Sequence, residues 1–186
     1  MGSRPIELPV EGLSDAEVLL RPLVESDLDS LVAALQDPEI PRWTRIPERY
    51  GEAQARGWLE LQHRRPASGD GVDMMIVEAG SGELLGGIGI PQIDWDERRC
   101  ELGYWLAREH RGRGLMRRAI RLFTRWIFRS LPIDRISIMT AVENAASRTV
   151  AERAGFQFEG VLRSYLVFKD GRHDVAMYSL LRSDPS

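Results

Sequence analysis

The chain has 186 residues, a formal net charge of −3, 43% hydrophobic and 28% charged residues, a composition typical of one soluble globular domain. Its slightly acidic balance argues against a general nucleic-acid binder, and no stretch reads as a membrane span or a signal peptide. The single cysteine, Cys100, excludes an internal disulfide, and together with only three histidines it gives no metal-ligand cluster. We therefore expect a cytoplasmic protein that needs no metal and binds neither nucleic acid nor membranes.

The chain alternates strands and helices in a single domain over residues 14–183, preceded by a flexible tail over residues 1–13. Apolar patterning and turn signals predict seven strands, over residues 18–23, 74–77, 84–93, 100–106, 136–140, 156–168 and 175–181. Four helices are predicted between them, over residues 26–37, 52–64, 114–130 and 144–154. Pro22 places the first strand at a sheet edge, because proline cannot donate to a strand ladder. This order favours an α+β fold with a mostly antiparallel sheet.

The fourth strand leads into a loop rich in glycine and arginine, Arg111-Gly112-Arg113-Gly114-Leu115-Met116, which opens the longest helix. The N–H groups and the positive dipole end of a helix N-terminus attract anions, and glycines let a ligand approach the backbone. The loop is not a P-loop, because no Gly-Lys-Ser/Thr follows, and it lacks the third glycine of a dinucleotide fingerprint. It is therefore either a pyrophosphate cradle or an ordinary tight turn with solvated arginines.

The loop and the strand before it, Glu-Leu-Gly-Tyr-Trp-Leu over residues 101–106, resemble the acetyl-CoA loop of the GNAT-superfamily N-acetyltransferases. The loop ends in a methionine, Met116, and in this respect it resembles the loop of the ribosomal-protein-alanine (RimJ/RimL-like) branch. Asn144-x-x-Ser147-x-x-Val150, followed by Ala-Gly-Phe over residues 154–156, resembles the downstream half of that branch. Two separated motifs in the right order make the resemblance specific for the superfamily but not for the substrate.

The resemblance implies a GNAT-like fold, with a mixed, mostly antiparallel seven-stranded sheet splayed between strands 4 and 5 and flanked by about four helices. The strands holding Glu101 and Ile138 would part, and acetyl-CoA would lie in the gap as a co-substrate. Its pantetheine arm would pair with the fourth strand, and its pyrophosphate would meet the glycine loop. The residues that the resemblance implies in cofactor binding are Trp105, Leu106, Ala107, Arg111, Gly112, Arg113, Gly114, Leu115, Met116, Asn144 and Ser147.

Two residues are candidates for catalysis. Glu101 is the candidate base, because a carboxylate in an apolar strand is costly unless it is paired or functional. Its structural alternative is an ion pair with Arg98 or Arg99, or a place at a sheet edge. Ser147 is the candidate acid, since its hydroxyl can hydrogen-bond the departing sulfur, and its alternative is a helix cap. Many GNAT enzymes carry a tyrosine at the position of Ala151, and its absence here favours Ser147.

Other conspicuous side chains are expected to have structural roles. Strand alternation places Tyr104 on the face opposite Glu101, where it packs in the core, and makes Cys100 a buried, inert thiol. Trp43, Tyr50 and Trp95 lie in loops and either line an acceptor pocket or cover the edge of the core. A stripe of arginines recurs at every fourth position of the long helix, over Arg113, Arg117, Arg121, Arg125 and Arg129. Past Arg121 it is expected to face solvent or an interface, because only the first turn can reach a phosphate.

These observations predict an N-acetyltransferase that moves acetyl from acetyl-CoA to a primary amine by direct attack in a ternary complex. The resemblance suggests a protein N-terminus, such as that of a ribosomal protein, as the acceptor, and small amines are the alternative. It also suggests a homodimer. The same residues are compatible with a non-catalytic acyl-CoA-binding sensor or scaffold, and more weakly with a phosphate-binding domain for ordinary nucleotides.

Overall fold

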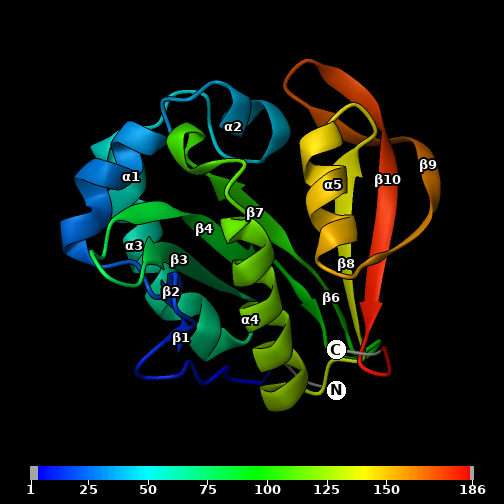
Figure 1. The fold of residues 1–186 in the computed structure, drawn as a ribbon, viewed down its shortest axis with the longest axis horizontal. Helices are drawn as coiled ribbons and strands as arrows, with labels where there is room; N and C mark the ends of the chain where they lie inside the picture. The colour runs from blue at the N-terminus through cyan, green and yellow to red at the C-terminus, as the bar shows by residue number, and fades with distance from the viewer. Residues whose placement is uncertain (1–3, 185–186) are drawn as a thin grey trace.

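The computed structural model describes residues 4–184, except for the side chain of His63, and contains two five-stranded sheets (Figure 1). The first sheet has the order β1-β2-β3-β4-β7 and the second the order β5-β6-β8-β10-β9. The first contains β1 (Leu13–Ser14), β2 (Val18–Arg21), β3 (Val72–Glu78), β4 (Leu84–Ile90) and β7 (Gly103–Leu106). The second contains β5 (Ile93–Asp94), β6 (Arg99–Glu101), β8 (Arg135–Ala141), β9 (Gln157–Phe168) and β10 (Gly171–Leu181). Only the β6–β8 pair is parallel among the described strands, so the expected mixed, mostly antiparallel α+β fold is confirmed.

The predicted fourth strand is divided between the two sheets, and a gap opens between β7 and β8 at this division. Glu101, the last residue of β6, pairs in parallel with Ser137, and the Leu102 N–H donates to the Ser137 carbonyl over 2.8 Å. From Gly103 onward β7 pairs with β4, while β8 continues beside β10. The expected splay is confirmed. The closed end of the gap, its apex, lies directly after Glu101, and Glu101 itself is still paired with β8.

Helices cover both faces of the first sheet. The α-helices are α1 (Leu28–Ala34), α2 (Glu39–Trp43), α3 (Glu52–Ser68), α4 (Leu115–Ser130) and α5 (Ala145–Arg153). Successive side chains of β3 alternate between two cores: Met74 and Ile76 pack with α4, whereas Met75 and Val77 pack with α1 and α3. Figure 1 shows α4 and α5 together on the near side of the gap. None of the helices in the described part of the chain is long and apolar enough to cross a membrane.

The N-terminal segment is more ordered than the expected tail, as far as it is described. The side chain of Ile6 is buried, and its N–H donates to the Pro66 carbonyl over 2.8 Å. Leu13 and Ser14 form β1 beside β2. The edge position predicted for the first strand is therefore wrong: β2 lies between β1 and β3, and ends at Arg21, before the proline.

Two helix predictions also differ from the structure. The predicted break at Pro66 is absent, because α3 continues to Ser68 with Pro66 inside its last turn. Proline has a helical φ and removes only one hydrogen bond there, and Gly69 ends the helix in a left-handed conformation (φ 74°). The predicted loop over residues 38–51 contains the short helix α2.

The arginine stripe of α4 faces solvent over most of its length. Arg117, Arg121, Arg125 and Arg129 are exposed, while the apolar positions between them are buried. The amphipathic periodicity therefore correctly predicted which face of this helix is buried.

Candidate active site

The glycine loop presents a row of unpaired backbone donors at the start of α4. Gly112 and Gly114 have φ angles of 76° and 78°, and Gly114 is the N-cap of the helix. No described residue accepts a hydrogen bond from the backbone N–H groups of residues 112–117. A Cβ added at either glycine would meet nothing within 4 Å, so the backbone here is open to a ligand. These are the properties of an anion site at a helix N-terminus.

Asp37 anchors this loop through two arginines that precede its glycines. Its carboxylate accepts hydrogen bonds from Arg108 over 2.8 Å and from Arg111 over 2.7 Å. Arg111 also donates to the Leu106 carbonyl, and its own N–H donates to the Arg108 carbonyl. Burial alone would raise the pKa of Asp37, but the arginines and the Glu39 N–H outweigh burial and hold the pKa below its ordinary range. Arg111 thus supports the loop through Nε and Nη2, which donate to the Leu106 carbonyl and to Asp37.

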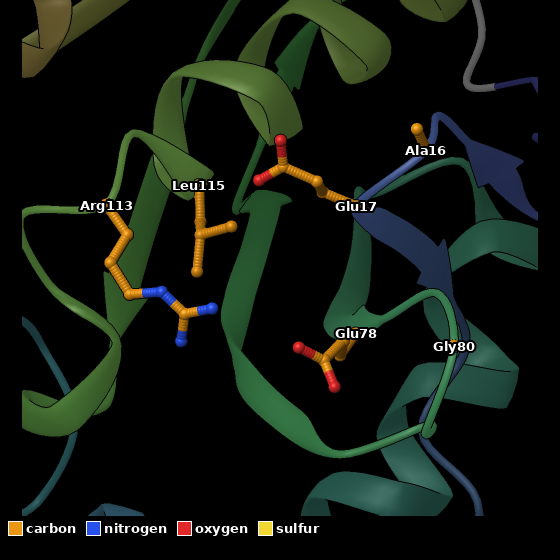
Figure 2. Close-up of a pocket in the computed structure, with 6 residues that line it drawn as sticks. All are labelled: Ala16, Glu17, Glu78, Gly80, Arg113 and Leu115. Carbon is orange, nitrogen blue, oxygen red and sulfur yellow. The ribbon is translucent and has the colours of Figure 1, made fainter.

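The side chain of Arg113 leaves the loop toward the first sheet. It lines a pocket of about 250 Å³ together with Ala16, Glu17, Glu78, Gly80 and Leu115. Figure 2 shows the guanidinium extending into this pocket, across from the carboxylates of Glu17 and Glu78. Arg113 is exposed, and no ion pair in the described part of the chain joins it to either carboxylate, so both its backbone N–H and its charge stay accessible to a ligand in the glycine loop.

The backbone of β7 offers hydrogen-bonding groups to the gap at alternate residues. The Ala107 N–H is bonded to the Leu85 carbonyl, in register with the pairs Trp105–Gly87 and Gly103–Gly89. In an antiparallel ladder the residues between such pairs turn their N–H and C=O groups the other way. Tyr104 and Leu106 therefore direct theirs into the gap, where Arg111 occupies the Leu106 carbonyl, whereas Trp105 and the N–H of Ala107 bond β4. Of the three residues expected to pair with a pantetheine arm, only Leu106 faces it.

Glu101 lies at the apex of the gap without a stabilising partner. It pairs with Ser137 and so points away from the core face that holds Cys100 and Ile136. No described residue hydrogen-bonds or ion-pairs its carboxylate, and burial raises its pKa, an effect that the charge of Arg45 opposes. The expected ion pair does not form, because the two neighbouring arginines pair elsewhere: Arg98 with Asp134 and Arg99 with Asp94. The other expected alternative, a sheet edge, does not apply either, since β6 lies between β5 and β8.

Ser147 and Asn144 lie on the other side of the gap, at the start of α5. The cap of this helix is Asn144, whose side-chain oxygen accepts the Ser147 N–H over 3.0 Å. The interpretation of Ser147 as a cap is therefore wrong, because its side chain caps nothing at this helix end. The Ser147 hydroxyl lies 3.0 Å from the hydroxyl of Tyr104.

Tyr104 was expected only to pack in the core. Its ring does so, but its hydroxyl contacts both the hydroxyl and the carbonyl oxygen of Ser147. The sequence carried one signal for this contact, namely that Tyr104 alternates onto the face opposite Glu101. The pairing itself joins residues 43 positions apart and depends on how α5 packs against β7.

The other candidates are structural, as the strand and loop patterns suggested. Cys100 is buried, and burial and the charge of Glu101 raise its pKa to about 12, so it is a neutral thiol. Trp95 donates to the Gly69 carbonyl and packs against the main core. Tyr50 packs in the second core, where its hydroxyl has no partner among the described residues. Trp43 instead contacts Phe168 and His173 in the β9–β10 hairpin.

A lysine that the sequence did not single out ties this hairpin to α2. Lys169 Nζ donates to the carbonyls of Pro41, Thr44 and Ile46 over 2.7, 2.9 and 2.7 Å. Figure 1 shows the hairpin and α2 meeting above the gap, on the side where β7 and β8 are separated. The two halves of the protein are therefore bridged at the open end of the gap as well as joined at its apex.

Comparison with known proteins agrees with this arrangement. A family model described as an acetyltransferase (GNAT) domain matches residues 17–157. The putative ribosomal N-acetyltransferase YdaF of Bacillus subtilis (strain 168) is 38% identical over 115 residues, which cover 60% of this chain and 63% of that protein. The uncharacterized N-acetyltransferase p20 of Bacillus licheniformis is 30% identical over 175 residues, or 94% of this chain and 98% of that protein.

A solved structure shows the same fold. RimL, described as a ribosomal L7/L12 alpha-N-protein acetyltransferase in complex with coenzyme A, has a TM-score of 0.82 and 22% identity, covering 91% of this chain and 97% of that one. The family expected from the two sequence motifs is thereby confirmed. The chain belongs to the GNAT family of acetyltransferases and has the architecture of an acetyl-CoA-dependent N-acetyltransferase.

Proposed function

We propose that this protein acetylates the primary amine of a peptide N-terminus by direct attack on acetyl-CoA in a ternary complex. The observation that carries the proposal is that one gap has unpaired N–H donors of residues 112–117 at one end and the unpartnered Glu101 at the other. The donors suit the pyrophosphate, and Gly112 and Gly114 leave room for it. The gap-facing N–H groups of Tyr104 and Leu106 suit the polar groups of an extended pantetheine arm.

The proposed chemistry assigns one proton to each side of the gap. Acetyl-CoA supplies an activated acetyl group, and the neutral amine attacks its carbonyl carbon, so that an N–C bond forms and the C–S bond breaks. Glu101 takes the proton that the nitrogen loses, and the departing sulfur takes a proton from the Ser147 hydroxyl. Solvent then removes the proton from Glu101 and restores that of Ser147, so the products are an amide and the thiol of coenzyme A. Backbone N–H groups of β7 stabilise the charge on the carbonyl oxygen.

The acceptor is proposed from the printed name of a relative together with the shape of the site. YdaF, at 38% identity, is named a putative ribosomal N-acetyltransferase. Lys169 bridges α2 and the β9–β10 hairpin across the open end of the gap, and the end of an extended peptide is the form of acceptor that we expect to fit beneath this bridge. A small amine such as a polyamine or an aminoglycoside is the competing acceptor.

A thiol-release assay with acetyl-CoA tests this function against its alternatives. Peptides that begin with alanine or serine are compared with the same peptides blocked at the N-terminus, with polyamines and with aminoglycosides. We expect release only with free N-termini, and mass spectrometry should find one added acetyl group at the α-amine. Binding of acetyl-CoA without turnover on any acceptor would instead support a sensor or scaffold, and calorimetry that finds ATP bound as tightly as coenzyme A would support a nucleotide module.

We also propose that two copies of the chain pair through β9. This strand has 12 residues and is the outermost strand described in the second sheet. It exposes large apolar side chains, with Val167 66% and Phe158 53% exposed, and long apolar edge strands tend to pair with other chains. Light scattering should find a dimer, and Val167→Lys should shift it toward the monomer. A monomeric parent protein at micromolar concentration would contradict the pairing.

The cytoplasmic location stays a prediction.

A further inference from the structure

A hydrogen-bonded pair spans the gap beside the proposed reaction centre. Tyr104 projects from β7, and its hydroxyl lies 3.0 Å from Ser147 Oγ and 3.3 Å from the Ser147 carbonyl oxygen at the start of α5. Both residues lie on the side of the first sheet that carries α4 and α5. Glu101 points to the other side, so the pair lies on the face opposite the proposed base.

The direction of this hydrogen bond decides what the serine can do. A hydroxyl has one proton and two lone pairs. When Tyr104 donates to Ser147 Oγ, the serine proton is free to point at a third group. When Ser147 donates to Tyr104, that proton is already used. The Ser147 carbonyl oxygen can only accept, so the Tyr104 O–H points toward Ser147, where Oγ at 3.0 Å is a closer acceptor than the carbonyl oxygen at 3.3 Å. Burial raises the pKa of Tyr104 to about 12, so the phenol keeps this proton at neutral pH.

We propose that Tyr104 is a positioning residue that donates to Ser147 Oγ and thereby aims the serine proton at the departing sulfur. The inference rests on the proposed role of Ser147 and adds a residue to it. Tyr104 itself transfers no proton to the substrate. Its hydrogen bond becomes stronger as the serine oxygen gains negative charge, which makes Ser147 a better donor than an isolated serine.

The test is a double-mutant cycle of Tyr104→Phe and Ser147→Ala, measured with acetyl-CoA and the best peptide acceptor. Tyr104→Phe keeps the ring and should lower kcat by about 3- to 10-fold, the effect of one hydrogen bond. Ser147→Ala should lower kcat by roughly 10²-fold. The double variant should be no slower than Ser147→Ala, because the hydroxyl of Tyr104 acts only through the serine. The dissociation constant of acetyl-CoA should change less than twofold in Tyr104→Phe.

Tyr178→Phe is the matched control. Tyr178 is a buried tyrosine on β10 whose hydroxyl also contacts α5, 2.9 Å from Glu152. Both tyrosine variants should lose comparable thermal stability, but only Tyr104→Phe should lose kcat. Equal losses of kcat in Tyr104→Phe and Tyr178→Phe would show that Tyr104 acts only through the stability of the fold.

The remaining outcomes separate this inference from the proposed function. Effects of Tyr104→Phe and Ser147→Ala that multiply in the double variant would overturn the inference, and so would full activity of Tyr104→Phe. An unaffected Ser147→Ala enzyme would remove the serine's role together with that of Tyr104, while acetyl transfer by the parent protein would still stand. Absence of transfer by the parent protein with any acceptor would instead contradict the proposed function itself.

Discussion

The carboxylate of Asp37 holds the guanidinium of Arg111 at 2.7 Å, although the two residues are 74 positions apart in the sequence. The same carboxylate accepts Arg108 and the N–H of Glu39, the first residue of α2. One buried acid therefore fixes both the glycine loop and the helix that reaches the β9–β10 hairpin. The side chain of Asp37 is 7% exposed, but those of Arg108 and Arg111 are 66% and 38% exposed, so the two ion pairs lie at the surface and are partly screened by water.

Asp37→Asn should weaken acetyl-CoA binding although residue 37 need not touch the ligand. The amide keeps the shape of the carboxylate but not its charge, so two arginines lose their common partner. We expect calorimetry to find a dissociation constant about 10-fold higher, equivalent to ~1.4 kcal/mol. Because the folded pKa of Asp37 lies below its unfolded value, the stability it contributes is present at neutral pH and is lost as pH falls below about 4. Asp134→Asn, which breaks exposed pairs with Arg98 and Arg182 away from the glycine loop, should leave the affinity unchanged.

Gly114→Ala should impair the glycine loop through backbone strain. Its φ of 78° is unfavourable for alanine by roughly 1–2 kcal/mol, and the added methyl group meets no neighbour within 4 Å. We expect a lower melting temperature and a higher dissociation constant for acetyl-CoA. Gly82, in the β3–β4 turn, has a φ of 76° and equally open surroundings, so Gly82→Ala is the matched control. An equal loss of affinity in both variants would mean that general destabilisation causes it.

Glu101→Gln should separate activity from stability. We expect kcat to fall by about 10²- to 10⁴-fold and the acidic limb of the kcat/KM profile to disappear. In the parent protein burial raises the pKa of Glu101, so that limb should lie above the usual glutamate value of about 4.3. A raised folded pKa means that the parent loses stability as pH rises from about 4 through the folded pKa, whereas glutamine does not. The variant should therefore melt at a higher temperature than the parent at pH 8. Unchanged turnover across pH would exclude Glu101 as the base.

Lys169→Met should loosen the bridge above the gap. Three carbonyl oxygens lose a charged donor, and we expect a cost of about 1–3 kcal/mol in unfolding free energy. The KM of the peptide acceptor should rise, while the affinity for acetyl-CoA, measured by calorimetry, should not. Arg125→Met removes one positive charge from an exposed helix position. It should change neither the unfolding free energy nor the KM of the peptide acceptor. A rise in KM of similar size in that variant would point to net charge as the cause.

The two sequence motifs predicted the family, the fold class and the location of the loop, because these depend on local patterns. Gly112 and Gly114 mark left-handed positions that the chain needs at the start of α4, and alternation in the fourth strand correctly separated Glu101 from Tyr104. Periodicity also gave the buried face of α4.

What the sequence could not predict are contacts between residues far apart in the chain. Arg111 looked like a ligand for phosphate, and only packing against the end of α1 reveals that Asp37 engages it. The contact between Tyr104 and Ser147 and the three bonds of Lys169 likewise require the tertiary fold. The continuation of α3 through Pro66 was missed because a helix tolerates proline in its last turn when its other contacts hold.

The division of one strand between two sheets at Leu102 has a consequence for inhibitor design. The N–H groups of the glycine loop open toward the side of α4 and α5, whereas Glu101 points to the opposite side of the sheet. In the proposed ternary complex the two substrates would therefore reach the reaction centre from opposite sides and would not have to pass each other. A compound that links coenzyme A covalently to a peptide would have to be threaded through the sheet between β7 and β8. Such a conjugate should bind slowly and dissociate slowly compared with either half alone.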